Sequence, residues 1–208
     1  MVEVVLFGLS SNRGGIETYL YKIWNHIDHS QFHFNFIDMT GNDMLPCFYN
    51  ELNKDGCSFY KITPRNISFK KNKEEIRKLF KDNHFDIFHF NVNTLSYLYP
   101  VEEALRNGCR VVVHSRNAGS AASGKLTRVL HEINKVRLSY MNVCRIAVSS
   151  MAGEWLFGKS KFKVFMNGVA TEEFKYLEEN RKKIREELRC SDKTVIANAG
   201  AFLPAKNH

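Results

Sequence analysis

The sequence predicts an α/β fold, a doubly wound and mostly parallel sheet of the Rossmann-like kind. Short runs rich in Val, Ile and Phe recur along the chain, as buried parallel strands do. Segments with helical spacing separate most of these runs, and alternation of strand and helix implies right-handed crossovers between parallel strands. With 208 residues, 44% of them hydrophobic, the chain can bury one good core, so one main domain is expected.

The expected strands are the apolar runs themselves, because β-branched and aromatic residues suit pleated, buried segments. In chain order they read VEVVLFGL, FHFNFIDM, CSFYKI, DIFHFN, RVVVHS, RIAVSS, KVFMNG and TVIANAG. Helices are expected where the apolar period changes to the helical one. They cover residues 15–28, 45–55, 72–83, 96–107, 124–142, 150–157 and 178–189.

The positive charge of the chain is concentrated in two blocks. A formal net charge of +8 permits nucleic acid, anionic lipid or a polyphosphorylated ligand as partner. The block at 61–81 is typical of a solvated helix surface. The block at 110–145 holds a basic ridge beside an apolar stripe. The ridge is Lys125, Arg128, Lys135 and Arg137, and the stripe is Leu126, Val129, Leu130, Ile133, Tyr140 and Met141. We expect the stripe to face the core and the ridge to face outward, either solvated or against an anionic membrane.

Cysteine usage and hydropathy indicate a cytoplasmic location. The five cysteines are odd in number and contain no CxxC pair, which favours a reduced protein. The sequence has no run of about 18 apolar residues and no secretory signal pattern. We therefore expect a cytoplasmic protein that can lie peripherally at the inner face of the cytoplasmic membrane.

The ligand site is expected beyond the carboxyl ends of the strands. Gly14 and Gly15 open a helix there, and their amide N–H groups would suit an anion, although the same pair also suits a simple turn. Glu17 lies in the first helical turn, where an acidic residue complements the helix dipole.

Polar residues also end two later strands. His114 follows three β-branched residues and precedes the polar loop SRNAGSAASG, so we expect it in the crevice with Arg116 and Asn117. As a crevice residue it should matter more to chemistry than to folding. His89 and Asn91 alternate on one strand and share a face. Asn91 is nearer the carboxyl end and is the better site candidate.

Two other functions remain open at this point. Asp38 ends the second expected strand, about 20 residues beyond the glycines, where a nucleotide-binding oxidoreductase places its ribose-binding carboxylate. The glycine spacing is not G-x-G-x-x-G, however, and DMTGND also reads as a turn. A basic nucleic-acid-binding module would need exposed aromatic residues among its Lys and Arg, whereas the sixteen phenylalanines fall mostly in the strand runs.

Six motifs, taken in order, carry a family resemblance. They are GGIETYL, DIFHFN, VVVHSRN, AVSSMAGEWLFG, FMNGVATEEF and NAGAFLPAKNH. Together they resemble the amino-terminal half of family-4 retaining glycosyltransferases of the GT-B type, in particular the enzymes of bacterial capsular polysaccharide and exopolysaccharide biosynthesis. The resemblance covers essentially the whole chain.

The resemblance implies both an organisation and an activity. Residues 1–170 would be the acceptor-side Rossmann-like domain, 171–193 a connecting helix and hinge, and 194–208 the first strand of a truncated donor-binding domain. The full-length enzyme would be a retaining hexosyltransferase. It would move a sugar from a nucleotide-sugar donor, UDP-linked by expectation, to a lipid-linked saccharide acceptor. The chain alone, as a half-enzyme, is expected to be inactive.

The resemblance also implies roles for the candidate residues. His114 would be catalytic, beside the transferred sugar. Gly14, Gly15 and Lys206 would bind the donor phosphates, and Asn167 and Gly168 would lead into the hinge. Residues expected on the acceptor or substrate side are Glu17, Asn91, Arg116 and Asn117.

No metal and no cofactor is expected, because N–H donors and basic side chains stabilise the leaving diphosphate in this family. One departure concerns that diphosphate site. Ala201 stands where the family has an arginine.

Overall fold

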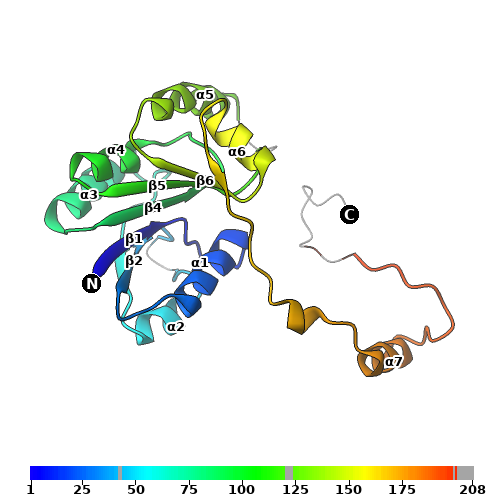
Figure 1. Ribbon diagram of the computed structural model, residues 1–208. Helices are drawn as coiled ribbons and strands as arrows, with labels where there is room; N and C mark the ends of the chain where they lie inside the picture. The colour runs from blue at the N-terminus through cyan, green and yellow to red at the C-terminus, as the bar shows by residue number, and fades with distance from the viewer. Residues whose placement is uncertain (42–43, 120–123, 199, 201–208) are drawn as a thin grey trace. The chain divides into compact units, whose positions relative to one another are not determined.

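The computed structural model describes residues 1–41, 44–119, 124–198 and 200, and its centre is a seven-stranded sheet (Figure 1). All strand pairings are parallel, in the order β3-β2-β1-β4-β5-β6-β7. The strands are β1 (Val2–Phe7), β2 (Phe32–Asp38), β3 (Ser58–Lys61), β4 (Ile87–Val92), β5 (Arg110–Ser115), β6 (Cys144–Ala147) and β7 (Lys163–Val164). The strand order reverses between β1 and β4, which makes this the switch point of a doubly wound sheet. The predicted fold class is confirmed.

Helices cover both faces of the sheet. They are α1 (Gly15–His26), α2 (Tyr49–Lys54), α3 (Phe69–Asp82), α4 (Tyr99–Arg106), α5 (Lys125–Ser139) and α6 (Ser150–Phe157). A short 3₁₀ helix, η1 (Thr171–Phe174), and α7 (Glu178–Glu187) follow. Each expected helix is present, with ends that differ by a few residues.

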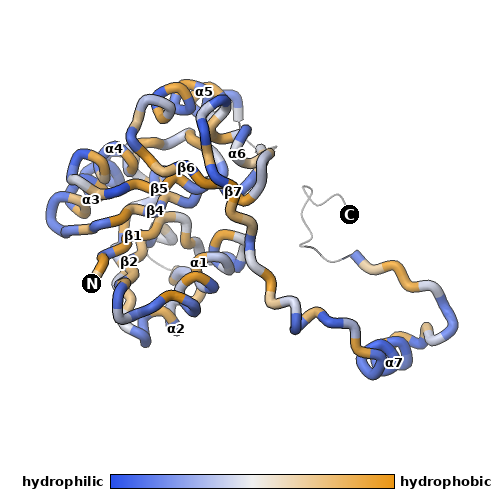
Figure 2. The backbone as a smooth tube through the Cα atoms, in the orientation of Figure 1, coloured by the Kyte–Doolittle hydropathy of each residue, from blue (hydrophilic) through white to orange (hydrophobic). Residues whose placement is uncertain are grey.

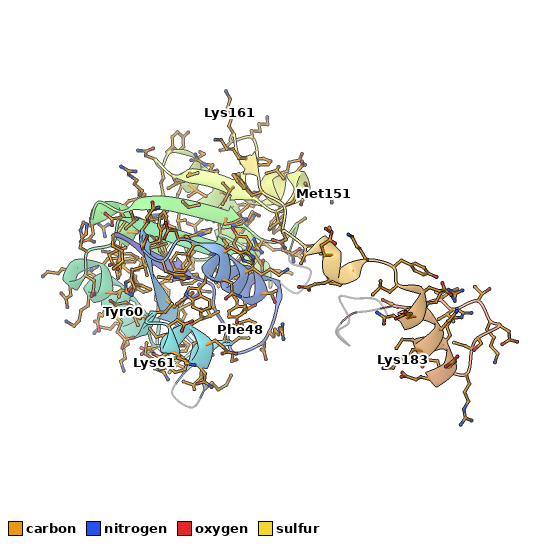
Figure 3. The ribbon with its side chains drawn as sticks, turned by 60° about the horizontal axis from the view of Figure 1, so that its bottom comes forward. Phe48, Tyr60, Lys61, Met151, Lys161 and Lys183 are labelled. Atoms are coloured by element: carbon orange, nitrogen blue, oxygen red, sulfur yellow. The ribbon has the colours of Figure 1, made fainter. Side chains whose placement is uncertain are left out.

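Alternation along the strands creates two cores. Val5 points into a core shared with α3, α4 and α6, while its neighbours Val4 and Leu6 point into one shared with α1 and α2. Apolar residues accordingly run along the strands in Figure 2. On the α1 and α2 side, Phe48, labelled in Figure 3, stacks on Tyr21 with ring centroids 4.2 Å apart.

The prediction for the apolar stripe of α5 is wrong. Leu126, Val129, Leu130, Ile133 and Tyr140 are between 37% and 87% exposed, and only Met141 packs partly against the core. The buried side chains of α5 are instead His131, Asn134 and Leu138. The two polar ones hydrogen-bond the backbone of Leu95, in the segment after β4. Local periodicity located the helix correctly, but the neighbour that α5 meets is a stretch of polar backbone.

The carboxyl-terminal part of the chain forms a separate unit. The chain divides into two compact units, residues 1–167 and 168–208. In the second unit the run TVIANAG forms no strand over its described residues, 194–198 and 200. A strand requires a hydrogen-bonding neighbour, and none of the described residues supplies one. The predicted donor-site residue Lys206, and Ala201, lie outside the described residues.

No helix in the described ranges combines the length and the apolar composition needed to cross a bilayer.

Candidate functional site

The predicted site residues of the first unit meet at the switch point, beyond the carboxyl ends of β1, β4 and β5. Asn91 lies in β4 and pairs with His114 in β5, so both point to the face that α1 covers. Arg116 follows β5, and Gly15 opens α1. The crevice is the position at which doubly wound sheets bind ligands.

Arg116 is the centre of this arrangement. Its Nη1 lies 3.2 Å from His114 Nε2, and its Nη2 donates to the carbonyl oxygen of Gly15 at 3.2 Å and to Asn167 Oδ1 at 3.0 Å. The guanidinium carbon lies 3.9 Å from the centroid of the Tyr19 ring, a cation–π contact. One side chain therefore connects α1, β5 and the end of the first unit.

Among the described residues no carboxylate lies within ion-pair distance of Arg116, although the charge of the nearby Glu17 acts on it. Arginine ion pairs in the described ranges involve Arg77, Arg106 and Arg137, not Arg116. Its Nε is buried without a hydrogen-bond partner. Burial lowers the pKa of Arg116 to about 10, which still leaves it charged at neutral pH. Glu17, whose carboxylate is bound to Ser10 and Gly14, offsets part of this charge. The amino terminus of α1 adds positive potential, so the crevice still suits an anion.

His114 lies beneath Arg116 and has no exposed surface. Its Nδ1 lies 3.2 Å from His89 Nε2, and the two rings are almost parallel, at 7°. Arginine can only donate, so His114 Nε2 accepts from Arg116, and His114 Nδ1–H donates to His89 Nε2. Burial, aided by the charge of Arg116, lowers the pKa of His114 to about 3 and that of His89 to about 4. Both imidazoles are neutral at physiological pH.

This geometry makes His114 a support for Arg116, because both of its ring nitrogens are engaged. The expectation that its loss would spare folding does not fit a side chain with 0% exposure. Its catalytic role stays a prediction.

Glu17 closes the glycine loop. Its Oε2 accepts from the amide of Gly14 at 3.1 Å, and its Oε1 accepts from Ser10 Oγ at 2.5 Å. The Gly14 amide is thus occupied, whereas the first N–H groups of α1, from Gly15 and Ile16, have no acceptor inside the helix. A Cβ added at Gly15 would meet nothing within 4 Å, so space is open at the start of α1.

Asn91 is buried beside Gly8, and its Oδ1 has no hydrogen-bond partner. Gly8 has φ +118°, and a Cβ there would lie 2.9 Å from the carbonyl oxygen of Asn91. Asn117 is exposed next to Arg116, and Gly168 is exposed in the second unit. A buried amide oxygen without a partner costs free energy unless a ligand or a water molecule donates to it.

Gly8→Ala is expected to lower the free energy of unfolding by about 2–4 kcal/mol, because strain at positive φ adds to the clash with Asn91. Gly108→Ala is the matched control. Gly108 also has positive φ, +84°, but a Cβ there meets nothing within 4 Å. Gly108→Ala should lower the free energy of unfolding by only about 1 kcal/mol. Urea denaturation of both variants measures the difference, and equal losses would show that the close approach to Asn91 does not matter.

Sequence reasoning missed Tyr19 and His89. Tyr19 lies four residues after Gly15, so helical spacing could have placed it on the same face of α1. His89 shares a face of β4 with Asn91, but it lies farther from the carboxyl end of the strand, so position in the strand alone favours Asn91.

Asp38 belongs to a turn. Its Oδ1 accepts from the amide of Thr40 at 2.8 Å and from Thr40 Oγ1 at 2.7 Å, and its side chain is almost wholly buried. This geometry supports the turn interpretation of DMTGND over a ribose contact. No group of three His, Cys, Asp or Glu within the described ranges is arranged to hold a metal ion.

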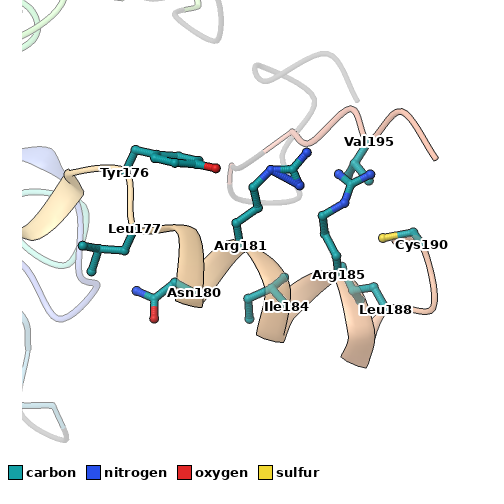
Figure 4. Close-up of a pocket in the computed structure, with 9 residues that line it drawn as sticks. All are labelled: Tyr176, Leu177, Asn180, Arg181, Ile184, Arg185, Leu188, Cys190 and Val195. Carbon is teal, nitrogen blue, oxygen red and sulfur yellow. The ribbon is translucent and has the colours of Figure 1, made fainter. Parts of the chain in front are cut away.

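The second unit has a shallow, open pocket along α7 (Figure 4). Its lining includes Tyr176, Leu177, Ile184, Leu188 and Val195. No predicted site residue lines it.

The chain resembles known proteins in its fold but not significantly in its sequence. No family model matches the sequence, and no curated protein is significantly similar to it. Among solved structures, HepE of Anabaena, in complex with UDP and glucose, matches with a TM-score of 0.61 and 17% identity, over 90% of this chain and 50% of HepE. MurG of Acinetobacter baumannii matches with a TM-score of 0.53 and 13% identity, over 85% of this chain and 48% of MurG.

A UDP-N-acetylglucosamine 2-epimerase matches with a TM-score of 0.50 and 16% identity, over 77% of this chain and 45% of the epimerase. The chain spans about half the length of each of these structures. The chain thus shares its Rossmann-like fold with about half of the GT-B structures MurG and HepE.

Proposed function

We propose that this chain is the acceptor-side half of a glycosyltransferase that uses a nucleotide sugar, and that its crevice meets the diphosphate of the donor. The observation that carries the proposal is the guanidinium of Arg116, which forms no ion pair with a described carboxylate and lies at the amino terminus of α1. The fold shared with HepE, a structure that contains UDP and glucose, supports it.

The chemistry of sugar transfer needs such a group. When the bond from the sugar to the diphosphate breaks, negative charge develops on the leaving phosphate, and donors already in place stabilise it. Arg116 has an unused Nε–H, and the start of α1 adds amide N–H groups. Tyr19, Gly15 and Asn167 hold the guanidinium in place before a ligand arrives. His114 would then act by supporting Arg116.

The finer assignment follows from the six motifs. We propose a retaining enzyme of family 4, in bacterial capsular or exopolysaccharide synthesis, with a lipid-linked saccharide as acceptor. The donor would be UDP-linked, and no metal or cofactor would take part. Ala201 replaces the family's arginine, so Arg116 would be the guanidinium that meets the diphosphate.

Neither alternative function gains support from the site. An oxidoreductase would need Asp38 free for a ribose, but Thr40 occupies it. A nucleic-acid-binding module would need exposed aromatics gathered on one surface. Phe34, Phe36, Phe88 and Phe90 are buried in the two cores, and the exposed Phe69, Tyr140 and Phe174 are spread over α3, the end of α5 and η1.

The proposal is tested by calorimetric titration of this chain with pyrophosphate, UDP and uridine. Arg116 and the first amides of α1 supply only a few donors to a ligand, so we expect pyrophosphate and UDP to bind with Kd values of roughly millimolar size, and uridine not to bind. Arg116→Gln should remove the binding. Arg110→Gln, at the opposite end of β5 and exposed, is the matched control and should leave it unchanged.

Three results would contradict the proposal. Micromolar binding of UDP would place the nucleotide site in this half and refute the assigned division between donor and acceptor. Tight binding of NAD would favour the oxidoreductase, and tight binding of short RNA the nucleic-acid module.

A further inference from the structure

The outward surface of α5 carries an apolar stripe that no other described element covers. We call it the α5 stripe, and it is formed by Leu126, Val129, Leu130, Ile133, Val136 and Tyr140. Exposed fractions range from 37% for Leu130 to 87% for Tyr140. The stripe runs the length of the helix. A contiguous apolar surface of this extent normally marks an interaction site.

The α5 stripe is not needed to hold the helix on the protein. The opposite side of α5 does that, since His131 Nδ1 accepts from the amide of Leu95 at 3.0 Å and Asn134 Nδ2 donates to the Leu95 carbonyl at 2.6 Å. His131 also stacks on Trp155, with ring centroids 4.3 Å apart. A helix that buries hydrogen-bonding side chains and exposes aliphatic ones requires an explanation other than packing.

Basic residues flank the stripe. Lys125 and Arg128, in the first turn, form no ion pair within the described ranges, whereas Lys135 pairs with Glu132 and Arg137 with Glu102. A Cβ added at Gly158 would lie 3.3 Å from the Lys135 side chain, so the loop that follows α6 packs against α5. That loop carries the exposed Lys161, which projects away from the protein in Figure 3.

We propose that the α5 stripe is inserted into the interface of a membrane containing anionic phospholipid. Aliphatic side chains would enter the boundary of the acyl chains, and the flanking cations would meet the headgroup phosphates. A second copy of the chain is the poorer occupant, because a symmetric contact would bring the same unpaired cations together. With 15 residues, α5 is roughly 22 Å long and charged, so it would lie along the surface.

The position of α5 would bring a bound membrane close to the crevice. The helix begins nine residues after Arg116, beyond the carboxyl end of β5. Its first turn is therefore at the same edge of the sheet as the crevice. A bilayer against the α5 stripe would lie beside the site, where a substrate carried in lipid could reach it. Membrane binding itself does not depend on the proposed transferase activity.

The test is co-sedimentation of the chain with vesicles of phosphatidylcholine alone and of phosphatidylcholine with phosphatidylglycerol. We expect binding to the anionic vesicles, weakened by salt but not abolished. The double variant Val129→Gln/Ile133→Gln should weaken it at least about tenfold at every salt concentration. The variant Lys125→Gln/Arg128→Gln should weaken it about tenfold at low salt and little at high salt.

Matched controls remove the same chemical groups elsewhere. Ile67→Gln removes an exposed isoleucine and Lys81→Gln an exposed lysine, and neither should change binding. All α5 variants alter exposed side chains, so their melting temperatures should equal that of the parent. Tyr140→Trp adds a local reporter, whose emission should shift to the blue on anionic vesicles.

Several outcomes would overturn the proposal. These are absence of binding, equal binding to neutral and anionic vesicles, or losses as large for Ile67→Gln as for the α5 pair. A dimer that Val129→Gln/Ile133→Gln dissociates, with no vesicle binding, would identify a second copy as the occupant. Because no donor or acceptor is present in the assay, its failure is separate from failure of the pyrophosphate titration.

Discussion

Arg116→Gln is expected to lower the turnover of the proposed full-length transferase by at least about a hundredfold. The guanidinium is held by Gly15, Asn167 and His114 before a ligand binds, so it would stabilise the charge of the leaving diphosphate without rearrangement. Glutamine removes that charge. Steady-state kinetics should show the loss in kcat, with a smaller change in the KM for the acceptor.

Two substitutions make the result specific. Arg110→Gln removes an arginine from the other end of β5 and should leave turnover unchanged. Arg116→Lys keeps the positive charge, but an ammonium group cannot reach all three acceptors that Arg116 bonds at the same time. Its turnover should therefore lie between that of the parent and that of Arg116→Gln. If Arg116→Gln retains full turnover while its melting temperature is unchanged, the anion-binding role is wrong.

Fold class and most element positions could be predicted because they depend on local pattern. The helix expected over 150–157 is found at Ser150–Phe157, where Ser149 Oγ accepts from the amide of Ala152 and fixes the start. The strand expected at RVVVHS is found at Arg110–Ser115. In both cases the residues at the ends of the element are enough to predict where it begins and ends.

The orientation of α5 could not be predicted, since it depends on what the helix meets. An apolar stripe normally turns inward, but Leu95 presents an amide and a carbonyl that need partners. His131 and Asn134 supply these partners. Periodicity in α5 gives no information on backbone groups that lie 36 and 39 residues earlier in the chain than the side chains that bind them. Similarly, the run TVIANAG has strand composition, but a strand also needs a neighbour.

Several residues of the site could be predicted from the sequence, but the contacts between them could not. Residues at strand ends, such as Arg116 and His114, could be found, because the fold class specifies where ligands bind. Their hydrogen-bond pattern could not, since the contact from Arg116 to Gly15 joins residues 101 positions apart. Tyr19 and His89 complete the cluster only after α1 and β4 have packed. The sequence therefore indicated the edge of the sheet, and the structure indicated which charged side chain lies there outside any ion pair of the described residues.

The free energy of unfolding is expected to fall as the pH drops from about 6.5 toward 5. In the folded protein the pKa values of His89, about 4, and His114, about 3, lie below that of an unfolded imidazole. Within this interval the unfolded chain binds protons that the folded chain does not, so acid favours unfolding. This stability is fully present above about pH 6.5, and each histidine removes at most about 1.4 kcal/mol per pH unit below it. Urea denaturation at a series of pH values measures the slope.

The variant His89→Gln tests whether the pH dependence of stability comes from the buried pair His89 and His114. It removes one of the two groups, so the fall in stability per pH unit should become clearly shallower, even if the variant is less stable throughout. His26→Gln, at an exposed position in the last turn of α1, is the matched control and should keep the parent slope. Burial also lowers the pKa of His131, which acts in the same direction, whereas Glu3 raises the pKa of the partly exposed His33, which acts in the opposite one. An unchanged slope in His89→Gln would therefore mean that the two stacked imidazoles are not held neutral beneath Arg116.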